Sequence, residues 1–226
     1  YKVYNSAITD VINEGMVSLP IKSKNYTTDD IKVDNLGNVY LLARIVKEKS
    51  ERVKGYSDFY YKLVVFAKDK SIKEFDFDYP DNDISYIDMI PGANNTFFCT
   101  GFLTNLKGGR KTLVSDEMFF AKFDCSTLKL DDSKMIKVEG LYPDEIKKNE
   151  DFVPYKIRNI YLKSNGGYSI VAEQYKLIIT THTTPNGGVT HHYRYYYCDI
   201  ACIQTDNKIN VESVTRMPKF QMNAAN

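Results

Sequence analysis

All three histidines of the chain fall within one predicted β-hairpin. The segment Thr180–Tyr193 places an Asn-Gly pair between two arms rich in β-branched residues, and Asn-Gly is a strong hairpin signal. A two-residue turn would set His182 opposite His191, whereas a three-residue turn would set it opposite His192. Either register brings two imidazoles close enough to share a divalent metal. The alternative is an exposed polar hairpin that happens to contain histidine, since a complete metal site needs further ligands.

The strand that leaves this hairpin is rich in tyrosine. Strand alternation puts Tyr193, Tyr195 and Tyr197 on one face and Arg194 on the other. Exposed tyrosine is typical of interfaces and can also stack on sugars. These four residues are therefore predicted to bind a protein or a glycan. Cross-strand packing along a long hairpin would favour the same residues and remains the alternative.

Glu173 is a charged residue in an otherwise apolar predicted strand. Such a charge must be paired or must face a channel, so Glu173 joins the predicted binding residues. No motif places a second acid beside it. The chain also has no phosphate-binding glycine-rich loop, no nucleophile elbow and no Cys-x-x-Cys pair. We therefore predict no catalytic residues and no cofactor.

The elements that must position these residues recur along the chain. A turn rich in Gly or Asn precedes a strongly apolar strand in Val33–Ile45, Ile90–Phe102 and Leu162–Tyr175. After each of these strands come a second apolar strand and then a strand with alternating polar residues. The pattern predicts an all-β fold of tandem four-stranded antiparallel sheets, like a β-propeller. A large β-sandwich is the alternative.

The predicted boundaries make residues 1–226 a single β-repeat domain. It comprises a half blade at 1–24, whole blades at 25–81, 82–140 and 156–222, and a helical linker at 141–155. The half blade is expected to pair Lys2–Tyr4 with Met16–Ile21. Three and a half units are fewer than the four to eight blades of a closed ring. Further sequence would therefore complete the ring, or the sheets would form an open, incomplete ring.

Composition limits the classes of partner. The 30 basic and 29 acidic residues are interleaved and leave a net charge of +1, which argues against binding to nucleic acid. No apolar run approaches the roughly 20 residues of a transmembrane helix. The four cysteines are too few for a disulfide framework at this length. Buried free thiols are expected, with a bridge between Cys99 and Cys125 as the alternative.

Several segments resemble a group of uncharacterised, exported propeller-like repeat proteins of Bacteroidota. The resemblance lies in Val33–Ala43, Gly167–Tyr175, Tyr195–Ile200 and Met217–Gln221, in the same order over most of the chain. It implies a propeller-like fold and an exported location in the periplasm, at the outer-membrane surface or outside the cell. Members of that group would be longer, so the chain is expected to lack blades. Its start at Tyr1, inside a strand-like pattern, also leads us to expect a processed, trimmed or partly observed polypeptide.

These observations predict a non-catalytic binding or interaction module of the cell envelope that recognises a protein or a glycan. The hairpin Ile178–Tyr197 is its expected contact element. One alternative is a structural accessory subunit of a larger outer-membrane complex. Another is a hydrolase or metal-dependent enzyme that uses a channel or the histidines.

Overall fold

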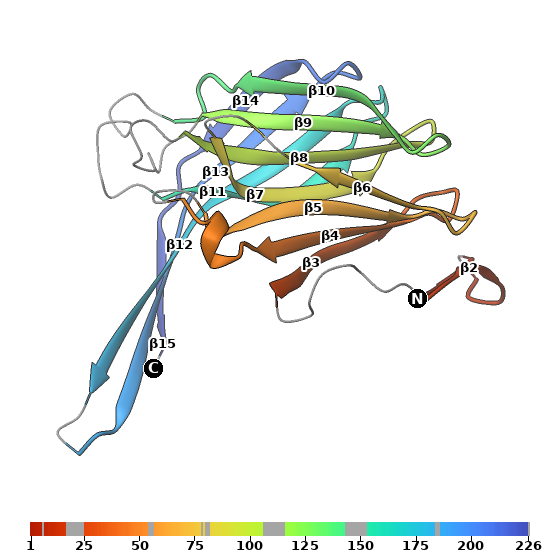
Figure 1. Ribbon diagram of the computed structural model, residues 1–226. Helices are drawn as coiled ribbons and strands as arrows, with labels where there is room; N and C mark the ends of the chain where they lie inside the picture. The colour runs from red at the N-terminus through yellow and green to blue at the C-terminus, as the bar shows by residue number, and fades with distance from the viewer. Residues whose placement is uncertain are drawn as a thin grey trace. The chain divides into compact units, whose positions relative to one another are not determined.

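A computed structural model shows that the chain is all-β, built from antiparallel sheets (Figure 1). It describes residues 1–5, 7–16, 25–53, 57–77, 79, 82–105, 116–142, 153–183 and 186–225. Within these ranges one 3-10 turn, η2 (Lys49–Glu51), is present, and no helix is long and apolar enough to cross a membrane. The chain divides into two compact units, Tyr1–Thr112 with Glu117–Ile136, and Leu113–Asp116 with Lys137–Asn226.

The first unit holds two four-stranded sheets in which each strand pairs with the next along the chain. The strands of the first sheet are β3 (Tyr26–Val33), β4 (Val39–Val46), β5 (Phe59–Phe66) and β6 (Ile72–Asp76). Those of the second are β7 (Asn82–Pro91), β8 (Thr96–Asn105), β9 (Glu117–Asp124) and β10 (Lys129–Lys137). A short ribbon of β1 (Lys2–Tyr4) and β2 (Val11–Glu14) precedes them.

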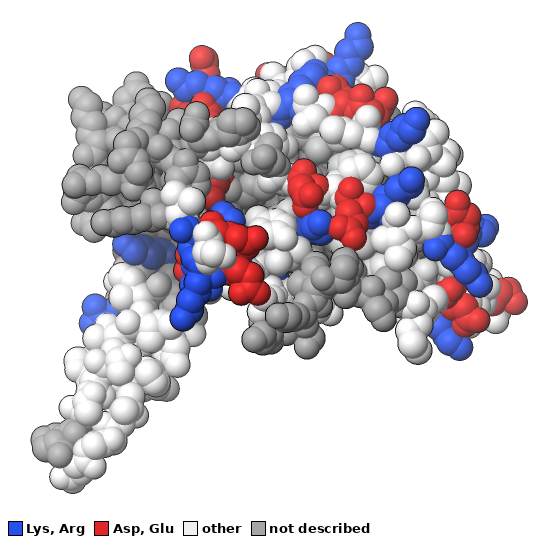
Figure 2. Space-filling model, viewed as in Figure 1, with Lys and Arg blue, Asp and Glu red and all other residues white. Residues whose placement is uncertain are grey.

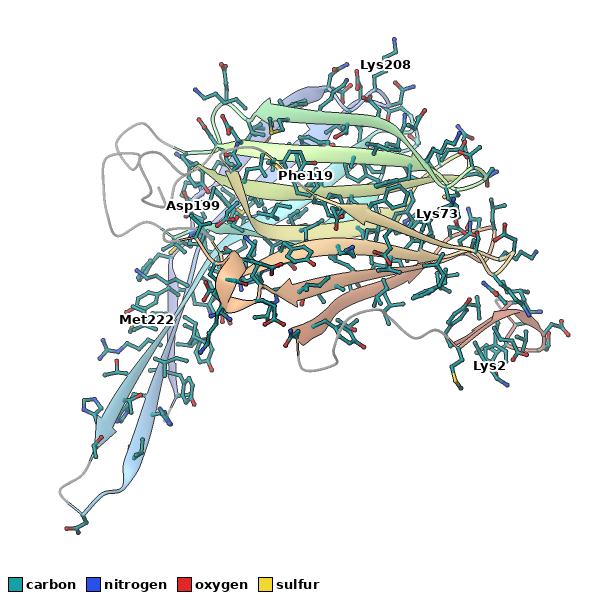
Figure 3. All side chains as sticks on the ribbon, in the orientation of Figure 1. Lys2, Lys73, Phe119, Asp199, Lys208 and Met222 are labelled. Atoms are coloured by element: carbon teal, nitrogen blue, oxygen red, sulfur yellow. The ribbon has the colours of Figure 1, made fainter. Side chains whose placement is uncertain are left out.

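One apolar core joins the two sheets of this unit. The rings of Tyr40 on β4 and Phe97 on β8 stack with centroids 3.6 Å apart. Phe119 on β9 is fully buried in the same core (Figure 3). These strands are apolar on both faces, as strands covered on two sides must be. All four cysteines are free thiols, and Cys99 and Cys125 are buried, as the sequence led us to expect.

The second unit is a single sheet in the order β11-β12-β13-β14, with β15 added to β13. Its strands are β11 (Tyr155–Leu162), β12 (Tyr168–Thr183), β13 (Val189–Thr205), β14 (Val211–Met217) and β15 (Gln221–Ala225). The first part of β12 and the second part of β13 are buried, with Ile170, Ala172 and Ile203 all fully covered. The other half of β12 is largely exposed from Leu177 onward, whereas residues 192–197 of β13 are half-buried apart from the exposed Arg194.

One five-residue turn recurs at four strand connections. In the turn Asp34–Asn38, the backbone N–H of Asp34 donates to the carbonyl oxygen of Asn38, and the carbonyl oxygen of Asp34 accepts from the N–H of Gly37. Gly37, the fourth residue of the turn, has a positive φ. Residues 67–71, 163–167 and 206–210 make the same two bonds. Asp34 and Asp206 each also accept two backbone N–H groups at Oδ1 and an asparagine amide at Oδ2. The same kind of turn therefore occurs in both units.

One local prediction differs from the structure, and another lies largely outside the described residues. The partner strand of β1 is Val11–Glu14 and not Met16–Ile21, because the side chain of Asn5 binds Thr9 and Asp10 and turns the chain back early. Met16 lies outside any strand, and residues 17–24 lie outside the described residues. Of the predicted helical linker at 141–155, residues 143–152 also lie outside them.

The fourth position of the recurrent turn gives a stability test. Lys70 holds a φ of 70° there and is exposed, a conformation that costs a residue with a Cβ about 1 kcal/mol. Lys70→Gly should therefore raise the free energy of unfolding by about 1 kcal/mol. The control Lys73→Gly, in the exposed strand β6, should lower it by about as much. Urea unfolding measures both, and a destabilised Lys70→Gly would contradict this account of the turn.

Candidate functional site

An exposed arm is the main candidate site. It consists of residues 175–183 of β12, residues 189–197 of β13, and β15 (Figure 1). β12 and β13 leave the sheet of the second unit at a bulge, where Gln174 faces the two residues Cys198 and Asp199. Bulges bend a strand pair and redirect it. Beyond this one, β11 and β14 no longer pair with the hairpin, and β15 takes the place of β14 along β13.

Glu173 fixes the base of the arm. Its Oε2 accepts from Nε and Nη2 of Arg158, each at 2.9 Å, and its Oε1 accepts from Nζ of Lys219 at 2.6 Å. Lys219 also donates its backbone N–H to Asp199. The carboxylate of Glu173 therefore joins β11, β12 and the link between β14 and β15. The sequence predicted that this charge must be paired, and the structure supplies two partners.

Two tyrosines continue this base. Tyr175 and Tyr197 face each other across the strands with ring centroids 5.3 Å apart. The guanidinium of Arg158 lies 5.2 Å from the ring of Tyr175 and 5.9 Å from that of Tyr197. Such cation–π contacts stabilise the pair by about 0.5–1 kcal/mol each at exposed sites. Ionic and aromatic contacts thus hold the hairpin where it leaves the sheet.

The same pattern, with the charges reversed, occurs in the first unit. Arg44 on β4 pairs with Asp29, which occupies the bulge of β3. Arg158, the partner of Glu173, occupies the equivalent bulge of β11. Burial raises the pKa of Asp29, and the nearby guanidinium lowers it in part. In these two sheets, a charge on the second strand is therefore neutralised from the bulge of the first strand.

One face of the arm, here called the tyrosine face, is aromatic and aliphatic. Its members are Tyr175, Leu177 and Ile179 of β12 and Tyr193, Tyr195 and Tyr197 of β13. Tyr193 and Tyr195 lie nearly parallel, with centroids 6.5 Å apart. The structure thus brings the three predicted binding tyrosines of β13 to one face, as alternation indicated.

The opposite face, here called the histidine face, carries two of the three histidines and Arg194. Thr183 pairs with Val189, and His182 faces Thr190. Both registers expected from the sequence are therefore wrong, since His182 lies opposite neither His191 nor His192. The rings of His182 and His192 nevertheless lie 5.1 Å apart at 79°.

The third histidine is separated from this pair. His191 lies on the tyrosine face, where its Nδ1 is 3.0 Å from the hydroxyl of Thr181. Among the described residues, no group of three or more His, Cys, Asp or Glu side chains could hold a metal ion. The predicted metal ligands His182, His191 and His192 thus do not converge on one site.

The arm has an unusual charge distribution. No Asp or Glu occurs from Gln174 to Cys198 or in β15, while Lys176 and Arg194 lie within the arm. In Figure 2 the projecting arm is white and blue, without red. Acidic side chains lie only at its base, at Glu173 and at Asp199, which is labelled in Figure 3.

Sequence reasoning missed two parts of this site. β15 was not predicted, although Met222 and Ala224 alternate with polar residues and give a weak strand signal. The bulge was not predicted either, and no turn residue marks it in the sequence.

Comparisons with protein-family models, curated proteins and solved structures find no match. Function must therefore be argued from the geometry of the arm.

Neutralising Glu173 tests the base of the arm. Glu173→Gln keeps the shape of the side chain but leaves Arg158 and Lys219 without a charge partner. We expect a loss of about 1–2 kcal/mol in the free energy of unfolding and faster amide exchange across residues 175–183.

The matched control is Glu212→Gln. Glu212 pairs with Lys163 at 2.6 Å but is more exposed, so its loss should cost under about 0.5 kcal/mol. Equal losses in the two variants, or unchanged exchange in the arm of Glu173→Gln, would show that Glu173 does not fix the arm.

Proposed function

We propose that the chain is a non-catalytic interaction module and that its arm binds a protein partner. The observation that carries this proposal is the set of large apolar side chains exposed on both faces of the arm. Ile179 on the tyrosine face is 53% exposed and Met222 on the histidine face is 52% exposed. Leu177, Val189 and Phe220 are exposed nearby.

Covering these side chains would stabilise a complex. Burial of apolar surface contributes about 25 cal/mol per Å², and tyrosine is enriched at protein interfaces. The aliphatic residues Leu177 and Ile179 lie beside the tyrosines and favour a protein over a glycan, because sugars stack chiefly on aromatic rings.

The outer edge of β12 offers a second mode of contact. Beyond Tyr175, which donates its N–H to Pro154, no described strand pairs with this edge. Natural proteins usually protect such an edge with charges, proline or a covering segment. Here only Lys176 provides a charge between Tyr175 and Thr183. An extended segment of the partner could add to this edge as a further strand.

The chemistry of the described residues supports a non-catalytic role. Both oxygens of Glu173 are bound by cations. Burial strongly raises the pKa of the Cys99 thiol and raises that of Cys125 to about 12. Nucleophilic cysteines need a lowered pKa, so these thiols are packing residues.

The proposed architecture is that of β-propeller blades. In all three large sheets the first four strands pair in sequence order, as in propeller blades, whereas sandwiches have Greek-key connections. The resemblance to exported repeat proteins supports placing this module at the cell envelope. The described residues form no closed ring, so the ring is part of the proposal.

Site-specific photocrosslinking tests the proposed contact. A photoreactive amino acid replaces Tyr195 of the arm, or Tyr161 of β11 as an exposed control outside the arm. The full chain is then irradiated in the cells that produce it. We expect one discrete, protease-sensitive adduct from position 195 and none from position 161, because Tyr161 lies outside the arm.

The adduct must also depend on the apolar surface. Ile179→Asp places a charge on the tyrosine face and should abolish it, whereas Ile72→Asp, on exposed β6, should leave it intact. An adduct resistant to protease but cleaved by glycosidases would replace the protein partner with a glycan. Equal adducts at positions 195 and 161 would overturn the role of the arm.

A further inference from the structure

The histidine face of the arm contains a hollow of about 300 Å³. Thr180 and His182 of β12, His192 and Arg194 of β13 and Ala224 of β15 line it. Ala224 lies opposite Arg194, and its small side chain keeps the space beside the guanidinium open. The hollow therefore depends on all three strands of the arm.

The groups around this hollow are donors or potential cations. Thr180 lies directly opposite His192, and Arg194 follows His192 by two residues on the same face, about 6–7 Å along the strand. The rings of His182 and His192 are 5.1 Å apart. No described carboxylate forms an ion pair with Arg194, and the segments that build the arm contain none.

These features favour an anion over a metal ion. A structural or catalytic metal site needs at least three protein ligands, and the guanidinium of Arg194 repels a cation. A guanidinium binds carboxylate, sulfate or phosphate oxygens through two parallel N–H groups. A hydroxyl and protonated imidazoles can donate to the remaining oxygens.

We infer that this hollow binds an oxyanion, a carboxylate or a sulfate-like or phosphate-like group. Arg194 is the main donor, and Thr180, His182 and His192 complete the site. This inference rests on the proposed function only in assigning the anion to the partner of the arm. Binding of the anion itself stands on the geometry of the hollow.

The charges of this face favour an anion. Its cations are Lys176 on β12 and Arg194 on β13. β15 contributes Met222 and Ala224, which carry no charge. The segments that build the arm contain no acid that would repel an anion.

The test is a titration of the full chain with sodium sulfate or sodium acetate at constant ionic strength, followed by NMR of the histidine ring protons. We expect saturable shifts of His182 and His192, with His191 on the other face unchanged.

Three variants separate the site from general charge effects. Arg194→Gln should weaken binding at least about tenfold, and Ala224→Leu should abolish it by filling the hollow with every charge intact. His191→Gln should have no effect. Tighter binding of sulfate would indicate a sulfate or phosphate group on the partner, and tighter binding of acetate an acidic side chain.

Shifts that do not saturate, or that persist in both Arg194→Gln and Ala224→Leu, would overturn the inference. Its failure is distinct from that of the proposed function. A chain that binds sulfate but gives no adduct at position 195 would retain the hollow and lose the protein partner. A chain that gives the adduct but does not bind sulfate would retain the protein partner and lose the anion site.

Discussion

The arm depends on the interaction of one carboxylate at a bulge. Glu173 accepts from Arg158 on β11 and from Lys219 on the link to β15, at the point where Gln174 faces Cys198 and Asp199. The bulge turns the hairpin out of the sheet, and the ion pairs hold it there. Because Lys219 is tied to the same carboxylate, β15 is placed beside β13 beyond the bulge.

In the proposed function, the arm separates binding from folding. The buried parts of β12 and β13 stabilise the sheet of the second unit. The parts that form the arm carry exposed apolar side chains, which contribute little to the stability of that sheet. Substitutions in the arm can therefore change contacts with a partner without unfolding the unit. The two faces differ in chemistry, since one is aromatic and aliphatic and the other carries Arg194 with two histidines. One arm can thus combine apolar contact with recognition of charge.

The sequence predicted the strands better than their junctions. Apolar runs such as Val39–Val46 located strands to within a few residues, since burial on both faces requires a continuous apolar pattern. The histidine register was wrong because the pairing of β12 with β13 ends at Thr183 and Val189, and an Asn-Gly pair alone does not fix where the pairing ends. β15 was missed because its small and polar side chains are exposed and leave little periodic signal.

The most direct test is the size of the native assembly with and without the arm. The chain is extracted gently from the cells that produce it, either intact or with residues 176–196 replaced by an Asn-Gly turn. Native mass and composition are then measured. The account predicts that the intact chain migrates with defined companions and that the shortened chain, still folded by circular dichroism, migrates alone. Identical assemblies from both chains would show that the contacts lie elsewhere on the molecule.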